Sequence, residues 1–448
     1  MRIGSLAAAV LLCLAAGPSL AAQDLLQTWQ AALSKDPVYS AARAAYRAGQ
    51  EKLPQARAGL LPAISAELGG LYHETRGAST MSLARNGSRN TWDLVLTQPL
   101  FDWSRWQTFE QSKLVVADVE LQLQQAYQDL LLRVAQAYFD VLAAQDALSA
   151  TVAEKTSIAA QLESAKHNFE LGTATITDTY EAQARYDLVL AEELLHQNEL
   201  DVRRDLLARI IGEMPGVLAE LPYGVHLPAP QPARLSDWSA QAKNANLGVT
   251  RAQLQTQIAQ YDIEIAGSGH YPTLNLRAAS GSVSDGTTQG NVSRNGRTVD
   301  SNIGLVLSIP IYTGGSVSSQ IAEKIQLEQK ARHDLEAARR QAEQAAREYY
   351  TGTVTGLARV RALEAGEKSS RAAVEAHRTG YAIGVRINLD VLNAQQQLYA
   401  TLRDLAQARY NTLLAGLRLK AASGSLSEAD LVAVNRLLRE PGQIKAAH

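Results

Sequence analysis

The residues best suited to chemistry in this 448-residue sequence are its histidines and its glycine-rich turns. Four histidines lie far apart, without the short spacing that ligands of one metal ion usually show: His167, His196, His333 and His377. The glycine pairs at 69–70 and 314–315 lack the lysine and the further glycines of a phosphate-binding loop. We therefore expect no enzyme, no cofactor and no metal site.

The only cysteine, Cys13, lies in an amino-terminal segment with the features of a secretory signal peptide. Arg2 precedes an apolar run over residues 6–16, and small residues follow up to residue 22. Because Leu12 rather than a small residue precedes Cys13, the pattern does not favour a lipoprotein signal. Cleavage near residue 22 would leave a mature chain without thiols, so its stability must come from packing or oligomerisation.

The charge balance and the hydropathy of the sequence limit the classes of partner that this chain can bind. The 43 basic and 45 acidic side chains nearly cancel, and the net charge is -2. This balance gives no basic footprint for nucleic acid, which we exclude as a partner. No later apolar run reaches the ~18 residues of a membrane-spanning helix, so any membrane crossing would need a barrel of strands.

The two halves of the sequence resemble each other when one is shifted by about 210 positions. The matched positions include Pro62 with Pro272, Pro99 with Pro310, Gly172 with Gly384, and Asp178 with Asp390. This duplication predicts two copies of one unit, each built as a helix, two strands, a very long helix, a break and a second helix.

Four segments alternate apolar and polar residues with period two, as half-buried strands do. Their apolar positions include Ile64, Leu68, Leu94, Leu96, Leu274, Leu276, Ile303 and Leu305. Such segments of ~10 residues are typical of a transmembrane barrel, although an ordinary sandwich strand would show the same alternation. Four strands cannot close a conducting barrel, so three chains that supply twelve strands are the economical solution. The segments 75–90 and 284–300, rich in Gly, Ser, Asn and Arg, are expected to be loops.

Two long stretches, 100–214 and 311–440, contain no proline and are dominated by Ala, Leu, Gln, Glu and Arg. Their apolar residues recur with the spacing of three and four that is typical of coiled coils. A single helix over 104–167 would be about 96 Å long, several times the thickness of a bilayer core. Rings of such helices from several chains would form a tube, whereas a coiled-coil scaffold without transport is the alternative class.

These residues resemble the TolC family of outer-membrane efflux and secretion proteins, across the mature chain from Asp24 to about Arg439. The motifs that carry the resemblance are the two strand-ending prolines, the segment 169–178 that begins Phe169-Glu170-Leu171-Gly172, and its repeat over 381–394. The resemblance implies a homotrimer in outer-membrane lipid, with a twelve-stranded β-barrel continued by a long periplasmic α-helical barrel. It also implies a periplasmic adaptor protein and an inner-membrane transporter of the ABC or RND type as partners.

The resemblance further assigns roles to single residues. Asp390 would form a ring of carboxylates in the pore constriction, with Asn393 where many relatives carry a second acid. Arg386 would hold the gate closed, with Thr177, Asp178 and Tyr381 as partners. Gly172 and Gly384 would lie in the tip turns that contact the adaptor.

These roles have structural alternatives, which are a solvated side chain for Arg386 and packing at a helix end for Tyr381. Asp390 in the first turn of a helix is favoured by the helix dipole. Asp178 followed by Glu181 has the spacing of a capping box, and glycine after a helical run is a common helix C-cap.

We therefore expect a mainly α protein with transmembrane β-strands. The expected organisation is a signal peptide (1–22), a first repeat (23–230; strands about 61–73 and 91–101, tip turn near 172), a second repeat (231–425; strands about 271–283 and 301–312, tip turn near 384) and a C-terminal equatorial segment (426–448). Its expected function is an outer-membrane exit duct for proteins or small toxic compounds. The absence of a lipid anchor leans toward protein secretion or multiple uses rather than dedicated drug efflux.

Overall fold

The computed structural model describes residues 22–75, 85–289 and 292–439, so the signal peptide and Cys13 lie outside the described residues. The chain forms two compact units, and each takes segments from both sequence halves. The helical unit contains the residues up to Arg43, Leu123–Val249, and the chain from Ala338 onward. The sheet unit contains Ala44–Gln122 and Thr250–Ala337. In the described part of the chain, no helix has the length and apolar character needed to cross a bilayer.

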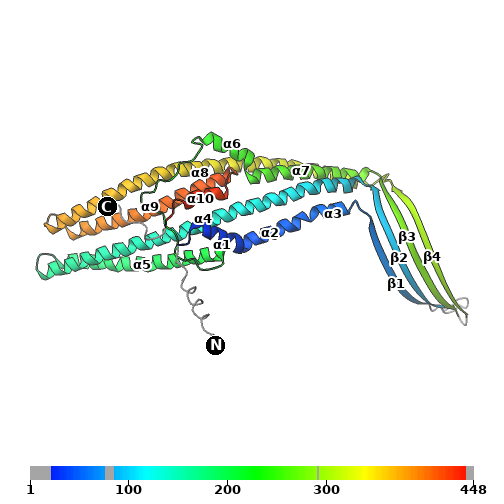
Figure 1. The fold of residues 1–448 in the computed structure, drawn as a ribbon, viewed down its shortest axis with the longest axis horizontal. Coiled ribbons are helices and arrows are strands. Elements are labelled where there is room, and N and C mark those ends of the chain that lie inside the picture. The colour runs from blue at the N-terminus through cyan, green and yellow to red at the C-terminus, as the bar shows by residue number, and fades with distance from the viewer. Residues whose placement is uncertain (1–21, 76–84, 290–291, 440–448) are drawn as a thin grey trace, which may run out of the picture. The chain divides into compact units, whose positions relative to one another are not determined.

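The sheet unit is built around one antiparallel sheet with the strand order β1-β2-β3-β4 (Figure 1). Its strands are β1 (Ala63–Thr75), β2 (Arg85–Phe101), β3 (Thr273–Gln289) and β4 (Val292–Ser308). The register places Ile64 opposite Leu96, Leu96 opposite Ala278, and Ala278 opposite Ile303. Because residues directly opposite one another share a face, the alternating apolar positions of all four strands form one apolar face.

The strands extend further than the sequence patterns predicted. The segments 85–90, 284–289 and 292–300 are strand, although we expected loops at 75–90 and 284–300. Cross-strand contacts continue into this polar region, where Arg89 Nε donates to Asp285 Oδ1 at 2.6 Å. Strand β4 ends at Ser308 instead of near 312, because Pro310 has no backbone N–H to offer a ladder.

Two very long helices cross from one unit into the other. They are α4 (Trp103–Glu170, 68 residues) and α8 (Ser316–Ala382, 67 residues). The prediction of an unbroken helix over 104–167 is therefore confirmed. The other helices are α1 (Leu25–Lys35), α2 (Pro37–Gln50), α3 (Lys52–Ala58), α5 (Ile176–Ile211), α6 (Leu235–Ala245), α7 (Leu247–Gly267), the short 3-10 helix η1 (Ser268–His270), α9 (Asn388–Ala422) and α10 (Glu428–Asn435).

The main core of the helical unit lies where α1, α4 and α9 pack together. Trp29, Tyr138 and Phe139 are fully buried there, and the ring of Phe139 stacks on that of Tyr410 at 5.6 Å between centroids. The buried Tyr138 hydroxyl donates to the carbonyl of Ala219 at 2.8 Å, which satisfies its polar group inside the core.

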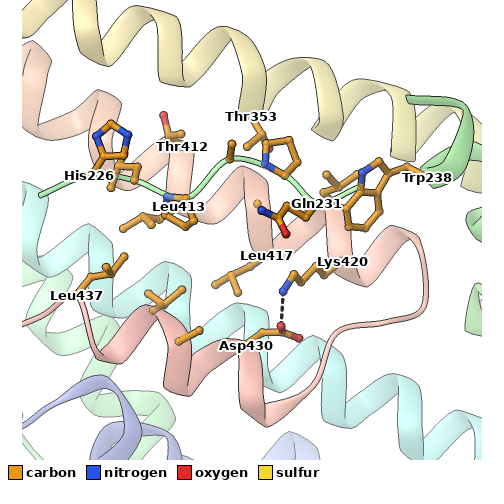
Figure 2. Close-up of a pocket in the computed structure, with 18 residues that line it drawn as sticks. His226, Gln231, Trp238, Thr353, Thr412, Leu413, Leu417, Lys420, Asp430 and Leu437 are labelled. Carbon is orange, nitrogen blue, oxygen red and sulfur yellow. Dashed lines mark hydrogen bonds and ion pairs between the residues drawn. The ribbon is translucent and has the colours of Figure 1, made fainter. Parts of the chain in front are cut away.

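A hollow of about 470 Å³ lies in the helical unit between residues 226–231 and helices α8, α9 and α10 (Figure 2). Lys420 and Asp430 form an ion pair at its edge. Gly416, in the interior of α9, lines the hollow, and a Cβ atom added there would meet no other atom within 4 Å.

Gly416→Ala is expected to stabilise the protein. Glycine in a helix interior costs about 1 kcal/mol relative to alanine, and the hollow leaves room for the added methyl group. The thermal midpoint of the detergent-solubilised protein should rise by a few degrees. A lower midpoint would show that the free space at Gly416 is needed for folding or assembly.

Candidate functional site

The turns that join α4 to α5 and α8 to α9 have the same backbone geometry. Gly172 and Gly384 adopt left-handed φ angles of 73° and 75°. In the first turn the N–H groups of residues 173 and 174 donate to the carbonyl of Asn168, and in the second those of residues 385 and 386 donate to Gly380. Glycine is suited to both turns because it adopts the left-handed conformation without a steric penalty.

Asp178 is held by its own turn. Its N–H donates to Thr175 Oγ1 at 3.4 Å, and its carboxylate accepts from the Thr175 N–H at 3.1 Å. The capping box therefore pairs Thr175 with Asp178, and the predicted pairing of Asp178 with Glu181 is wrong. The N-cap lies three residues earlier than expected because the turn after Gly172 is so short. Thr177, which precedes Asp178 in the chain, is exposed to solvent.

Arg386, which precedes the N-cap of α9, and Asp390, in the first turn of α9, form an ion pair with 3.7 Å between Nη1 and Oδ2. Their side chains are 55% and 34% exposed, and a pair this open adds little to stability. The Arg386 side chain also lies over Gly380, where a Cβ would come within 2.7 Å of Arg386 Cγ. Within one chain, then, the ion-pair partner of Arg386 is Asp390, and neither Thr177, Asp178 nor Tyr381.

Helices α4 and α5 form a first hairpin, and α8 and α9 form a second. Tyr381 and Asn393, which belong to the second hairpin, each contact the first hairpin. The Tyr381 hydroxyl accepts a long hydrogen bond of 3.4 Å from Asn168 Nδ2 at the end of α4. Asn393 Oδ1 accepts from Arg185 Nη2 of α5 at 3.1 Å, on an exposed surface. The candidate constriction residue Asn393 is therefore tied to the neighbouring hairpin of the same chain.

Sequence reasoning missed Asn388 and Gln161, which make the buried hydrogen bonds of this region. Asn388 is fully buried at the start of α9, and its Oδ1 accepts from Gln161 Nε2 at 2.7 Å. Its Nδ2 donates to the Asp178 carbonyl at 3.0 Å. An asparagine at a helix start usually indicates a cap, so residue type gave no sign of a contact more than 200 positions away.

An apolar cluster joins the two hairpins beneath these polar contacts. It is formed by Ile158, Leu162, Ala165, Ala182, Val189 and Leu392, which come from α4, α5 and α9. The turns themselves expose aliphatic side chains to solvent: Leu171, Ile176, Ile383, Val385 and Ile387. Exposed apolar groups gathered at two neighbouring turns are typical of a protein interaction site.

A buried ion pair ties α9 to α4 further along the helices. Arg403 Nη1 lies 2.8 Å from Glu154 Oε2, and the Glu154 side chain is only 2% exposed. Burial raises the pKa of Glu154 above its usual value, and the hydrogen bond from Arg403 opposes that rise. Arg403 therefore offsets part of the cost of desolvating this carboxylate.

Comparison with known proteins identifies relatives over nearly the whole chain. The model of the outer membrane efflux protein family matches residues 28–213 and 238–425. The outer membrane protein TolC of Escherichia coli (strain K12) is 35% identical over 433 residues, which cover 94% of this chain and 86% of that protein. The alkaline protease secretion protein AprF of Pseudomonas aeruginosa is 31% identical over 426 residues, covering 92% and 86%.

Solved structures share the fold. The outer membrane protein VceC of Vibrio cholerae superposes with a TM-score of 0.74 at 20% identity, covering 89% of this chain and 96% of that chain. The outer-membrane channel OprN gives 0.75 at 18% identity, covering 90% of each. The expected fold class is confirmed, since long helices and an amphipathic sheet occur in a chain that the family model matches in two successive segments. The chain belongs to the outer membrane efflux protein family, and it is an export channel of the outer membrane and not an enzyme.

Proposed function

We propose that three copies of this chain form a gated exit duct in outer-membrane lipid, with twelve strands closing a barrel and the long helices forming a periplasmic tube. The observation that carries the proposal is the sheet. Among the described residues, β1 and β4 are each paired on one side only, over 13 and 17 residues. Unpaired edges of this length beside a continuous apolar face require partner strands, because no backbone group can stay unpaired in lipid.

Helix α5 supports assembly in the helical unit. Leu188, Leu195 and Val202 are spaced by seven residues and are 61%, 62% and 47% exposed. A heptad-spaced apolar stripe is stable only against another helix. In the proposed trimer, a helix of a neighbouring copy would cover this stripe. The same proposal takes residues 1–22 as a cleaved signal peptide, 23–230 and 231–425 as the two duplicated units, and 426–448 as an equatorial segment.

The tip turns are the proposed gate. Three Asp390 carboxylates, one from each chain, would surround the pore and attract cations, with Asn393 one turn further along. Once its ion pair with Asp390 breaks, Arg386 would contact Thr177, Asp178 or Tyr381 of a neighbouring copy. The turns at Gly172 and Gly384, with their exposed aliphatic residues, would bind the periplasmic adaptor and through it an ABC or RND-type pump.

For the cargo we propose protein secretion, alone or among several uses, over dedicated drug efflux. The relatives above 30% identity include AprF, which is named for protease secretion. The similar solved channels are at 20% identity or below and bear on the fold alone. In a host without its own duct, this protein should restore secretion of a protease by an ABC exporter. Restored drug resistance without any secretion would favour the efflux branch.

Single-channel recording of the purified protein in planar bilayers tests the duct and the gate together. Wild type should show small cation-selective openings, and Arg386→Ser should show larger ones. A trivalent cation should block the pore, and Asp390→Ala should abolish that block. Because Arg386 partly neutralises Asp390, the block should be tighter in Arg386→Ser than in wild type.

Asp93→Asn, on the polar face of β2, is the matched control for charge removal away from the tips. If block is lost equally in Asp93→Asn and Asp390→Ala, the constriction does not lie at Asp390. A soluble monomer that never conducts would contradict the duct and leave the coiled-coil scaffold as the better interpretation.

A further inference from the structure

We propose that Asn388 positions the first turn of α9 against the first hairpin of its own chain, and that its two amide hydrogen bonds must break before the second hairpin can open the tip. The inference rests on the proposed function, because it concerns the gate of the duct. It identifies a latch inside each chain, which is separate from any contact between chains.

The geometry gives Asn388 a central place among three helices. Its amide accepts from Gln161 of α4 at 2.7 Å and donates to the Asp178 carbonyl of α5 at 3.0 Å. The first hairpin thus supplies a hydrogen-bond partner to both the oxygen and the nitrogen of the Asn388 amide. Since Asn388 itself is fully buried, water cannot easily replace either partner as the hairpins separate.

Two other polar ties between the hairpins near the turns are weaker by this criterion. The bonds from Arg185 to Asn393 and from Arg378 to Ser157 both lie on exposed surface. Water can take over each partner when such a bond breaks, so the loss is small. Close to the two turns, the Asn388 contacts are the ones whose rupture leaves unsatisfied groups inside the protein, whereas the buried pair of Arg403 and Glu154 lies further along α9.

Asn388 also fixes a helix start that lacks a side-chain cap. The N-cap of α9 is Ile387, whose side chain makes no capping hydrogen bond. Leu392, one turn after Asn388, packs into the apolar cluster with residues of α4 and α5. Asn388 and Leu392 therefore hold one face of α9 on the first hairpin, next to the Arg386 and Asp390 pair in the chain.

A latch of this kind should respond to solution conditions differently from an ionic lock. The contacts of Asn388 and Gln161 join neutral groups in a buried place, so salt should not weaken them. The exposed charges of Arg386 are screened by salt at the ~10 Å scale of 0.1 M ionic strength. Salt dependence therefore separates the two contributions to closure.

The test is single-channel recording of the full-length protein, carried out at low and high salt. The variants are Asn388→Leu and Gln161→Met, alone and combined, with Arg386→Ser as a reference. Asn388→Leu should increase the fraction of time spent open about tenfold or more, equally at both salt concentrations. The double variant should open no more than Asn388→Leu alone, because the two residues share one contact.

Tyr410→Phe is the matched control, since it removes a different, partly buried hydrogen bond, from Tyr410 to Asp146, far along α9 from the turn. It should lower thermal stability without increasing the open fraction. This separates a positioning role from general destabilisation.

The outcomes are distinct. If wild type conducts and Arg386→Ser opens it while Asn388→Leu and Gln161→Met behave as wild type, the latch is overturned and the gate stands. If the Tyr410→Phe control opens the duct as much as Asn388→Leu, the latch is likewise overturned. If no variant conducts at all, the proposed function fails first.

Discussion

Replacing Arg403 with methionine should lower the free energy of unfolding by about 3–5 kcal/mol at neutral pH, because it leaves the buried Glu154 carboxylate without its partner. Burial already raises the pKa of Glu154, and removal of Arg403 should raise it further. A raised carboxyl pKa means that the folded state holds its proton more tightly than the unfolded state. The loss should therefore be small at acidic pH and should grow as pH rises through the folded-state pKa.

Thermal unfolding of the solubilised protein over a range of pH checks this prediction. The double variant Arg403→Met with Glu154→Gln should recover most of the stability, because it removes both charges. Lys330→Met, which breaks an exposed ion pair with Asp334, is the matched control and should change little. An equal loss in the double variant would mean that packing by the Arg403 stem, and not charge, holds the helices together.

Replacing Asp146 with asparagine should stabilise the protein at neutral pH by up to about 3 kcal/mol, because a carboxyl group whose pKa burial raises to about 6 is unfavourable when ionised in the folded state. Burial raises the pKa of Asp146 to about 6, and the hydrogen bond from Tyr410 only partly opposes that shift. The Asp146 carboxylate accepts this bond from the Tyr410 hydroxyl at 2.7 Å. Asparagine keeps an oxygen for Tyr410 and removes the desolvated charge.

The stability of the wild-type protein and that of Asp146→Asn should depend on pH in different ways. Since the folded-state pKa lies above the ordinary value, the contribution of Asp146 to wild-type stability is greatest below that ordinary value and is lost as pH rises through about 6. The thermal midpoint of Asp146→Asn should lack this decline, while the exposed Asp205→Asn control should follow wild type. A destabilised Asp146→Asn at pH 7.5 would show instead that its charge is needed by the nearby, buried Arg409.

The sequence patterns predicted those features that depend on local periodicity or on chain stiffness. The period-two alternation around Ile64 and Leu276 identified the apolar face of the sheet, and the absence of proline identified α4 and α8 as unbroken. Gly172 and Gly384 marked the turns because few other residues tolerate a left-handed backbone. The extent of the strands was underestimated because Ser, Asn and Gly suit loops, yet here a paired neighbour keeps them extended.

Contacts between helices distant in sequence could not be predicted in this way. Periodicity tells which face of a helix is buried but not which side chain it meets, so nothing in the sequence indicated that Asn388 contacts Gln161 or that Glu154 pairs with Arg403. The pairing of Arg386 with Asp390 spans four positions, but Arg386 lies before the N-cap of α9, so the rule for pairs on one helix face did not indicate it.

The strand edges of β1 and β4, unpaired among the described residues, have a consequence for the time before the proposed trimer forms. Until these edges meet partners in that trimer, each chain carries two long hydrogen-bonding templates beside an apolar surface, the combination that recruits other strands into aggregates. A newly exported chain is therefore at greatest risk in the interval between secretion and association. Chaperone protection of these edges, or association faster than misfolding, is a condition for the protein to reach the membrane intact.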